Sequence, residues 1–242
     1  MATLALVFSA LLIGVSKAGF GGGSGLVVGP LLALLYPAKE SVGLMLPLLF
    51  VCDVAALYPY WGKWDNRNVL ALTPGAVAGI VAGSFALDAV SDVLLGRLIG
   101  GIAIGFGLVQ IYREWLVRTE TLLAPSFWFG ILVGFGTGFV STLSHVGGVL
   151  TTMYLLAQRL DNERFVATTT AVYFLINLAK IPVYVDLGVL DAALFWRVSP
   201  FLPMAVLGTA LGVYLNRRVS GAWFGRLILL LVLVTGLKLL LS

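Results

Sequence analysis

Apolar stretches about as long as a lipid bilayer is thick recur along the whole chain, and they constrain its fold more than any other feature. They include residues 69–87, 93–112, 165–185, 192–215 and 223–241, each near the roughly 20 residues that cross a bilayer as a helix. Only 11% of the 242 residues are charged, whereas soluble domains carry about 25%. The connecting segments 88–92 and 186–191 are too short to hold an extramembrane domain. The sequence therefore predicts an all-α integral membrane protein.

The charged residues and the few metal-binding side chains exclude several classes of function. The net charge is +4, but the cations stand singly near predicted helix ends rather than in a stripe, so nucleic acid is not an expected partner. Cys52 and His145 are the only cysteine and histidine, which leaves no ligand cluster for a metal ion. We expect no cofactor and no enzymatic activity. The expected partners are the lipid bilayer and a small solute.

An internal repeat divides the chain into two halves. A pattern of six residues, Val-Ser-x-x-x-x-Gly-Arg-Leu-Ile, occurs at 90–99 and again at 219–228. At an offset of 125, Gly22-Gly23 falls on Gly147-Gly148. The sequence thus predicts repeats at about 1–120 and 121–242 within one membrane domain. Each repeat is predicted to contain two short apolar segments around a Gly-rich break, followed by three full-length helices.

The charges of equivalent loops indicate that the two halves have inverted topology. One pair of loops carries two cations in the first half and two aspartates in the second, and the next pair reverses this pattern. The residues are Lys63, Arg67, Asp186 and Asp191 in the first pair, and Asp88, Asp92, Arg217 and Arg218 in the second. Because Lys and Arg favour the cytoplasmic side, both termini are predicted to face outward. Inverted repeats are the design of many secondary transporters.

The short segments 26–35 and 149–157 are predicted to be arms of re-entrant hairpins. About ten helical residues rise only about 15 Å, whereas the hydrocarbon core is about 30 Å thick. Two hairpins that enter from opposite faces bring their Gly-rich tips together near the midplane, where a substrate site is expected.

The first tip, residues 16–25, has the chemistry of an anion site. Its glycines let the backbone turn sharply, and a helix that begins near Ser24 directs its N-terminus toward the tip. Lys17 adds a positive charge. The alternatives are that the glycines serve close helix packing and that Lys17 extends to the membrane interface. The candidate substrate-binding residues of this tip are Lys17, Gly21, Gly22, Gly23 and Ser24.

The second tip, residues 141–148, has the same pattern with hydroxyl groups added. Hydroxyl and amide donors can replace the water around an oxyanion, and His145 can add charge. The alternative for His145 is a hydrogen-bonded core residue. The candidates here are Thr142, Ser144, His145, Gly147 and Gly148. A packing role is instead expected for Gly79, Gly83, Gly208 and Gly212.

Asp53 and Lys180 lie inside predicted spans, where charges are costly and suggest function. The offset of 125 places Cys52 opposite Asn177, so Asp53 and the turn 177–180 are expected at matching depths. We predict that Asp53 is a coupling or gating site and that Asn177 and Lys180 bind the substrate. A plain Asp53–Lys180 ion pair is the alternative. Tyr184 is expected at the membrane interface rather than at the site.

These motifs together resemble the sulfite exporter TauE/SafE family of bacterial membrane permeases. The resembling segments are Gly-Phe-Gly-Gly-Gly-Ser-Gly at 19–25, Met-Leu-Pro at 45–47 followed by Asp53, Trp-Asp at 64–65 before Thr-Pro-Gly at 73–75, Ser-Thr-Leu-Ser-His-Val-Gly-Gly at 141–148, and Asn-x-x-Lys-x-Pro-x-Tyr at 177–184. The second Gly-Gly is followed by Val149-Leu150, where many relatives have proline. The resemblance implies a multi-pass protein of the bacterial inner membrane that transports sulfite, sulfonate or sulfoacetate, usually by export.

The residues and the resemblance together predict a secondary transporter that binds a small sulfur-containing oxyanion between the two hairpin tips. Protons are a candidate coupling ion, and the sequence leaves a homodimer open. The alternatives are an anion channel and an uptake permease for another small anion.

Overall fold

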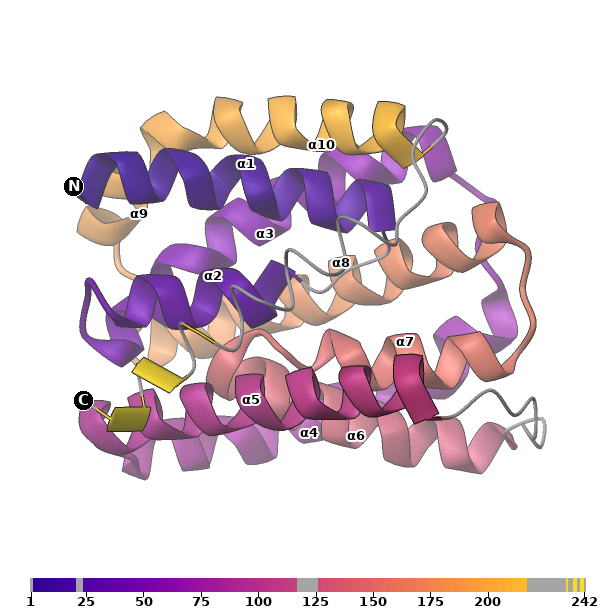
Figure 1. Ribbon diagram of the computed structural model, residues 1–242, viewed down its shortest axis with the longest axis horizontal. Coiled ribbons are helices and arrows are strands. Elements are labelled where there is room, and N and C mark those ends of the chain that lie inside the picture. Colours follow the sequence, from indigo (N-terminus) through magenta and orange to yellow (C-terminus); the bar gives the residue numbers. More distant parts are fainter. Residues whose placement is uncertain are drawn as a thin grey trace.

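All the secondary-structure elements in the described part of the chain are helices. The computed structural model describes residues 2–20, 24–116 and 126–216, together with 234, 237–238 and 240–241. The elements in these ranges are α1 (Ala2–Phe20), α2 (Ser24–Ala33), α3 (Ala38–Tyr60), α4 (Asn66–Ala89), α5 (Asp92–Leu116), α6 (Phe127–Ser144), α7 (Gly148–Ala157), α8 (Asn162–Asp186), α9 (Ala192–Val198), the 3₁₀ turn η1 (Ser199–Phe201) and α10 (Leu202–Asn216). The predicted all-α class is confirmed (Figure 1).

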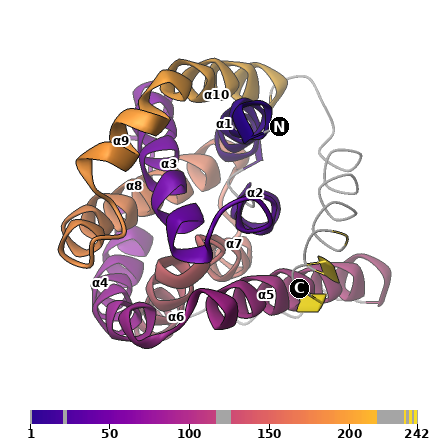
Figure 2. The same cartoon turned by 90° about the vertical axis from the view of Figure 1, so that its left-hand side faces the viewer.

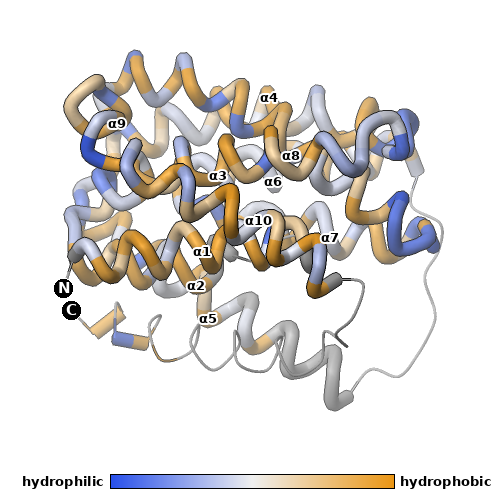
Figure 3. The backbone as a smooth tube through the Cα atoms, turned by 90° about the horizontal axis from the view of Figure 1, so that it is seen from above, coloured by the Kyte–Doolittle hydropathy of each residue, from blue (hydrophilic) through white to orange (hydrophobic). Residues whose placement is uncertain are grey.

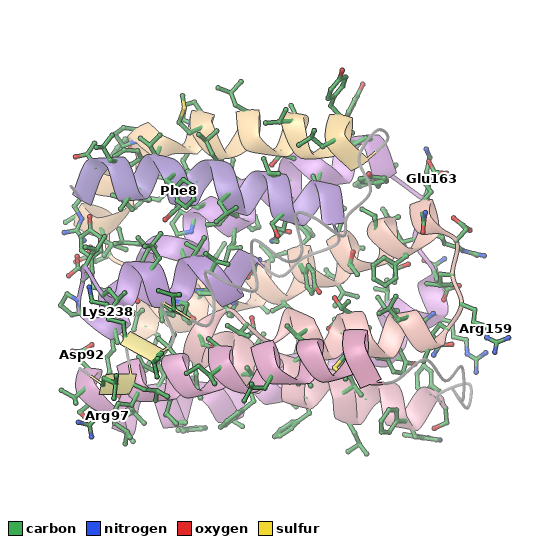
Figure 4. The ribbon with its side chains drawn as sticks, viewed as in Figure 1. Phe8, Asp92, Arg97, Arg159, Glu163 and Lys238 are labelled. Carbon is green, nitrogen blue, oxygen red and sulfur yellow. The ribbon has the colours of Figure 1, made fainter. Side chains whose placement is uncertain are left out.

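The helices lie side by side with their polar connections at the two ends of the bundle. Five of the described stretches, 38–60, 66–89, 127–144, 162–186 and 192–215, are long and apolar enough to cross a membrane. In Figure 3, where the tube is coloured by residue hydropathy, hydrophilic segments concentrate at the two ends of the bundle. In Figure 4, Arg159 and Glu163 lie at one end, and Asp92, Arg97 and Lys238 lie at the other. This arrangement is that of a multi-pass membrane protein.

The order of helices recurs along the chain, as the predicted repeat requires. A long helix, a short helix and two longer helices begin at Ala2, Ser24, Ala38 and Asn66, and the same series begins again at Phe127, Gly148, Asn162 and Ala192. In Figure 1, α1 runs from the left end toward the right, whereas α6 runs from the right end toward the left. The inverted repeat itself stays a prediction, and residues 217–233, which include Arg217, Arg218 and Arg226, lie outside the described residues.

Only the second arm of each hairpin is short. α2 and α7 have 10 residues each, but α1 has 19 and α6 has 18, so the expectation that both arms are short is wrong for the first arms. The physical reason is that the apolar helix continues to the polar tip, where His145 ends α6 in the left-handed conformation with φ 56°. In Figure 1, α2 occupies the left half of the bundle and α7 the right half.

Glycines let the helices of the two halves approach closely. The most extensive contacts join α4 to α6 and α1 to α10, and Figure 2 shows these pairs on opposite sides of the bundle with α3 and α8 between them. A Cβ added to Gly79 would lie 2.8 Å from the Phe139 nitrogen, and one added to Gly208 would lie 3.0 Å from the Leu11 Cα. A Cβ at Gly83 would lie 2.9 Å from the Thr142 Cβ. The packing role predicted for these three glycines is therefore confirmed.

The predicted helix at 192–215 is interrupted by one 3₁₀ turn at Ser199–Phe201. Pro200 has no N–H group, so it cannot donate to the carbonyl of Trp196, four residues earlier. The Ser199 hydroxyl donates to that carbonyl instead, at 3.0 Å. The chain then continues as α10 (Leu202–Asn216).

Candidate substrate site

Four polar side chains on one face of α8 organise the interior of the bundle. Tyr173, Asn177, Lys180 and Tyr184 are separated by four, three and four residues, which places them in one row along a helix. All four are buried, and Lys180 and Tyr184 are 0% exposed. Such a row within a membrane helix is costly unless each group finds a partner.

Asn177 on this row supports an ion pair between the first hairpin and α3. The Lys17 ammonium, on α1, contacts the Asp53 carboxylate and also donates to the Leu49 carbonyl at 3.2 Å. The Asn177 amide donates to the other carboxylate oxygen at 2.6 Å. The alternative Asp53–Lys180 ion pair is therefore wrong, because Lys17 is the cation that pairs with Asp53. Lys17 points into the bundle rather than to the membrane interface, with an exposed fraction of 7%.

Lys180, one turn further along α8, is held by neutral groups. Its ammonium lies 2.7 Å from Nδ1 of His145, 3.0 Å from the Ser141 hydroxyl and 3.3 Å from the Ser141 carbonyl oxygen. An ammonium has three N–H donors and no acceptor. All three donors are thus satisfied without a carboxylate.

His145 connects this cation to α3. Its Nε2 lies 2.9 Å from the carbonyl oxygen of Val42. A carbonyl oxygen only accepts, so Nε2 carries the proton and Nδ1 accepts from Lys180. His145 lies at the second tip as expected, and the structure in addition places it beside Lys180. Its role in substrate binding stays a prediction.

The buried basic and acidic side chains do not match in number. Among the described residues, the buried side chains of this kind are the amines of Lys17 and Lys180 and the carboxyl group of Asp53. Asp53 contacts Lys17, so Lys180 has no carboxylate partner. A buried charge without a counter-ion is unfavourable in a medium of low dielectric, so the interior is suited to receive an anion.

The two hydroxyl groups predicted to bind substrate are turned toward their own helix. Thr142 donates to the Gly138 carbonyl at 2.8 Å, and Ser144 donates to the Val140 carbonyl at 2.9 Å. Both are the i−4 bonds that Ser and Thr commonly make inside helices. In this conformation Ser141 provides the hydroxyl beside Lys180 instead. The sequence interpretation left Ser141 out of the site residues, although it lies in the same motif.

Two tyrosines of α8 fix the second tip, and neither was predicted to do so. Tyr173 donates to the Gly148 carbonyl at 2.8 Å, and Tyr184 donates to the Thr142 carbonyl at 2.7 Å. Tyr184 is fully buried, so its expected position at the membrane interface is wrong. The spacing of the α8 row was the signal in the sequence that could have identified both residues.

Glycine is required at Gly147 and Gly148 because the tip is crowded. A Cβ on Gly148 would lie 2.9 Å from the Tyr173 hydroxyl, and one on Gly147 would lie 2.9 Å from the backbone nitrogen of Ser141. In the first tip, α2 begins at Ser24 as predicted. Gly21, Gly22, Gly23 and the side chain of Ser24 lie outside the described residues.

The bundle and its interior define the class of protein. Helices long enough to cross a membrane surround buried polar and ionisable side chains that come from two helix hairpins and from α3 and α8. No group of three His, Cys, Asp or Glu in the described residues could hold a metal ion. Intramembrane charges paired within a bundle mark the pathways of membrane transporters.

Comparison with known proteins gives the family. Residues 6–239 match the family described as sulfite exporter TauE/SafE, and the chain belongs to that family of membrane transporters. It is similar to the probable membrane transporter protein y4hK of Sinorhizobium fredii (strain NBRC 101917 / NGR234), with 25% identity over 249 residues that cover 98% of this chain and 97% of the relative. No solved structure matches the chain.

Proposed function

We propose that this protein is a secondary transporter of small sulfur-containing oxyanions such as sulfite, sulfonates or sulfoacetate. The observation that carries the proposal is the buried amine of Lys180, which is 0% exposed, has only neutral partners and has no carboxylate beside it among the described residues. The sulfur chemistry of the substrate comes from the family, which is described as sulfite exporters.

Lys180 is the main counter-charge for the anion. An oxyanion that reaches it replaces one of the neutral acceptors, either Nδ1 of His145 or the Ser141 hydroxyl, and forms a shorter and stronger charge-assisted hydrogen bond. Asn177 and the hydroxyls of Thr142 and Ser144 supply further donors once they rotate away from their present partners. The backbone at Gly147 and Gly148 lets the anion approach the start of α7.

The first hairpin contributes in a different way, because Lys17 already has a counter-ion. Asp53 acts as a gating group that holds Lys17 until the substrate arrives, and Lys17 then joins the anion together with Gly21, Gly22, Gly23 and Ser24. Protonation of Asp53 would release Lys17, which is how protons would be coupled to transport. The two halves, 1–120 and 121–242, move against each other in alternating access, with export across the bacterial inner membrane.

Ligand-induced stabilisation of the purified protein tests the substrate site. A ligand at 100 times its Kd stabilises the folded state by about 2.7 kcal/mol, so sulfite, sulfoacetate, thiosulfate, sulfate and taurine can be ranked by the rise in melting temperature. We expect Lys180→Met to abolish the rise and Lys180→Arg to keep part of it. Lys39→Met is the matched control, because Lys39 lies at one end of the bundle and donates to the Asp88 carbonyl.

If the ligand-induced rise in melting temperature is unchanged in the Lys180→Met variant, Lys180 does not bind the substrate and the proposed site is wrong. Transport by the reconstituted protein then separates a carrier from an anion channel. Saturable counterflow in liposomes is expected for a carrier, whereas large single-channel currents would show a channel.

A further inference from the structure

Ion pairs between the two halves of the chain lie at both ends of the bundle. At one end the Glu40 carboxylate, on α3, contacts the Arg197 guanidinium, on α9. At the other end the Lys63 ammonium, in the connection before α4, lies 2.7 Å from the Glu163 carboxylate, on α8. We call these contacts the Glu40 latch and the Lys63 latch.

The acidic residues of the two latches occupy equivalent places in the repeated series of helices. Glu40 lies in the first turn of α3 and Glu163 in the first turn of α8, and these are the third helices of their halves. The basic partners belong to the other half in each case: Arg197 lies in the last turn of α9, and Lys63 lies in the connection before α4. Each half thus supplies the acid at one end and the base at the other.

The two residues of the Glu40 latch line a hollow between the halves. This pocket of about 500 Å³ is lined by Glu40 and Lys39 from the first half and by Val189 and Arg197 from the second. Val189 also belongs to an apolar cluster with Val42, Leu143 and Tyr184. The carbonyl of Val42 accepts from His145, and Tyr184 donates to the second tip, so the lining of the hollow shares an apolar cluster with residues that contact the candidate site.

The Lys63 latch has a second contact at its side. The backbone N–H of Asp65 donates to the Thr168 hydroxyl at 2.9 Å, and the Asp65 carboxylate lies 3.7 Å from the Arg164 guanidinium. Beneath it, Tyr60, Val166 and Ala167 form a small buried apolar cluster. Both ends therefore have the same construction, with an exposed ion pair over an apolar layer.

We propose that the Glu40 latch and the Lys63 latch close the two ends of the transport pathway, and that each one opens in turn during alternating access. This inference rests on the proposed function as a transporter. The latches are weak enough for this role, because Lys63 and Glu163 are 48% and 60% exposed and Arg197 is 49% exposed. Exposed ion pairs of this kind shift an equilibrium by no more than about five-fold.

Thiol labelling from each side of the membrane tests the latches. Cys52 is the only cysteine, so a Cys52→Ala background leaves one thiol when Val42→Cys or Val166→Cys is added. Both positions are buried, at 1% and 4% exposed, one under each latch. The rate of reaction with a membrane-impermeant maleimide is measured in intact cells and in inverted vesicles, without substrate.

We expect Glu40→Gln to increase labelling of the Val42→Cys thiol by up to about five-fold and to leave or lower labelling of the Val166→Cys thiol. Lys63→Gln should have the opposite pattern. Lys39→Gln is the matched control: Lys39 lies in the same hollow, but its bonds go to Asp88 and Asp92 of its own half. Its removal should change neither rate.

Equal increases at both thiols, or no change at either, would overturn the latches. The sulfite-induced rise in melting temperature is measured on the same variants and reports the proposed function separately. If the two latch variants show opposite labelling patterns but sulfite does not bind, the role of the latches is supported and sulfite is refuted as the substrate. If sulfite binds but the labelling patterns are not opposite, the substrate site is supported and the role of the latches is refuted.

Discussion

The replacement Asp53→Asn tests whether the Asp53 carboxylate is needed as the counter-ion of the buried Lys17 ammonium. The Asp53 and Lys17 side chains are 1% and 7% exposed, so the ion pair is buried on both sides. The substitution keeps the size of the side chain but leaves the Lys17 ammonium without its buried counter-ion. Removing one partner of a buried pair costs about 3–5 kcal/mol.

This change is large enough to measure as a shift in melting temperature. For a chain of 150–250 residues, 1 kcal/mol corresponds to about 2–4 °C, so Asp53→Asn should lower the melting temperature by about 6–20 °C. Cys52 is 0% exposed and adjacent to Asp53. A fluorogenic thiol reagent that reacts with Cys52 on heating therefore reports the opening of this region directly.

The double variant Lys17→Met with Asp53→Asn separates charge from other effects. It removes both charges, so it should recover most of the stability that Asp53→Asn loses, since apolar replacements of buried pairs are often neutral. Asp186→Asn, at an exposed position, should stay within about 0.5 kcal/mol of the wild type. If Asp53→Asn is as stable as the double variant, the Lys17 ammonium has no need of a buried counter-ion and the charge argument fails.

Three further predictions follow from the packing, the second tip and the topology. Tyr184→Phe leaves the Thr142 carbonyl without its donor, which should destabilise the protein by about 1–3 kcal/mol in the same thiol assay. An unchanged melting temperature would show that the bond is not formed. Gly138→Ala should also destabilise the protein, because the added Cβ would lie 2.8 Å from the Ala76 carbonyl carbon. Gly105→Ala is the control: a Cβ at Gly105 has nothing within 4 Å, so this variant should be as stable as the wild type. Equal effects of the two substitutions would contradict the packing role of Gly138. A reporter fused in the 186–191 loop should be periplasmic, and a cytoplasmic signal would mean that the halves are not inverted.

The helices could be predicted from the sequence because a lipid environment leaves the backbone few choices. Long apolar stretches must satisfy their own N–H and C=O groups, so they form helices whose approximate bounds follow from hydropathy. The positions of α2 and α7 followed from short apolar segments next to glycines: the predicted segments were 26–35 and 149–157, and the helices are Ser24–Ala33 and Gly148–Ala157. The length of the first arms could not be predicted, because it depends on which polar residues find partners inside the bundle.

For the candidate site too, some features could be predicted from the sequence and others were decided only by the tertiary structure. The sequence by itself determined that Asp53, Asn177 and Lys180 lie within membrane helices, since charged and amide groups stand out in apolar segments, whereas it placed Lys17 in the Gly-rich tip rather than in α1. Which groups pair was decided by the tertiary structure alone, because Lys17 and Asp53 are 36 residues apart and Asn177 and Asp53 are 124 apart. Pairing over such separations depends on how α1, α3 and α8 pack against one another. Only that packing leaves Lys180 among neutral partners, where an anion can serve as its counter-ion.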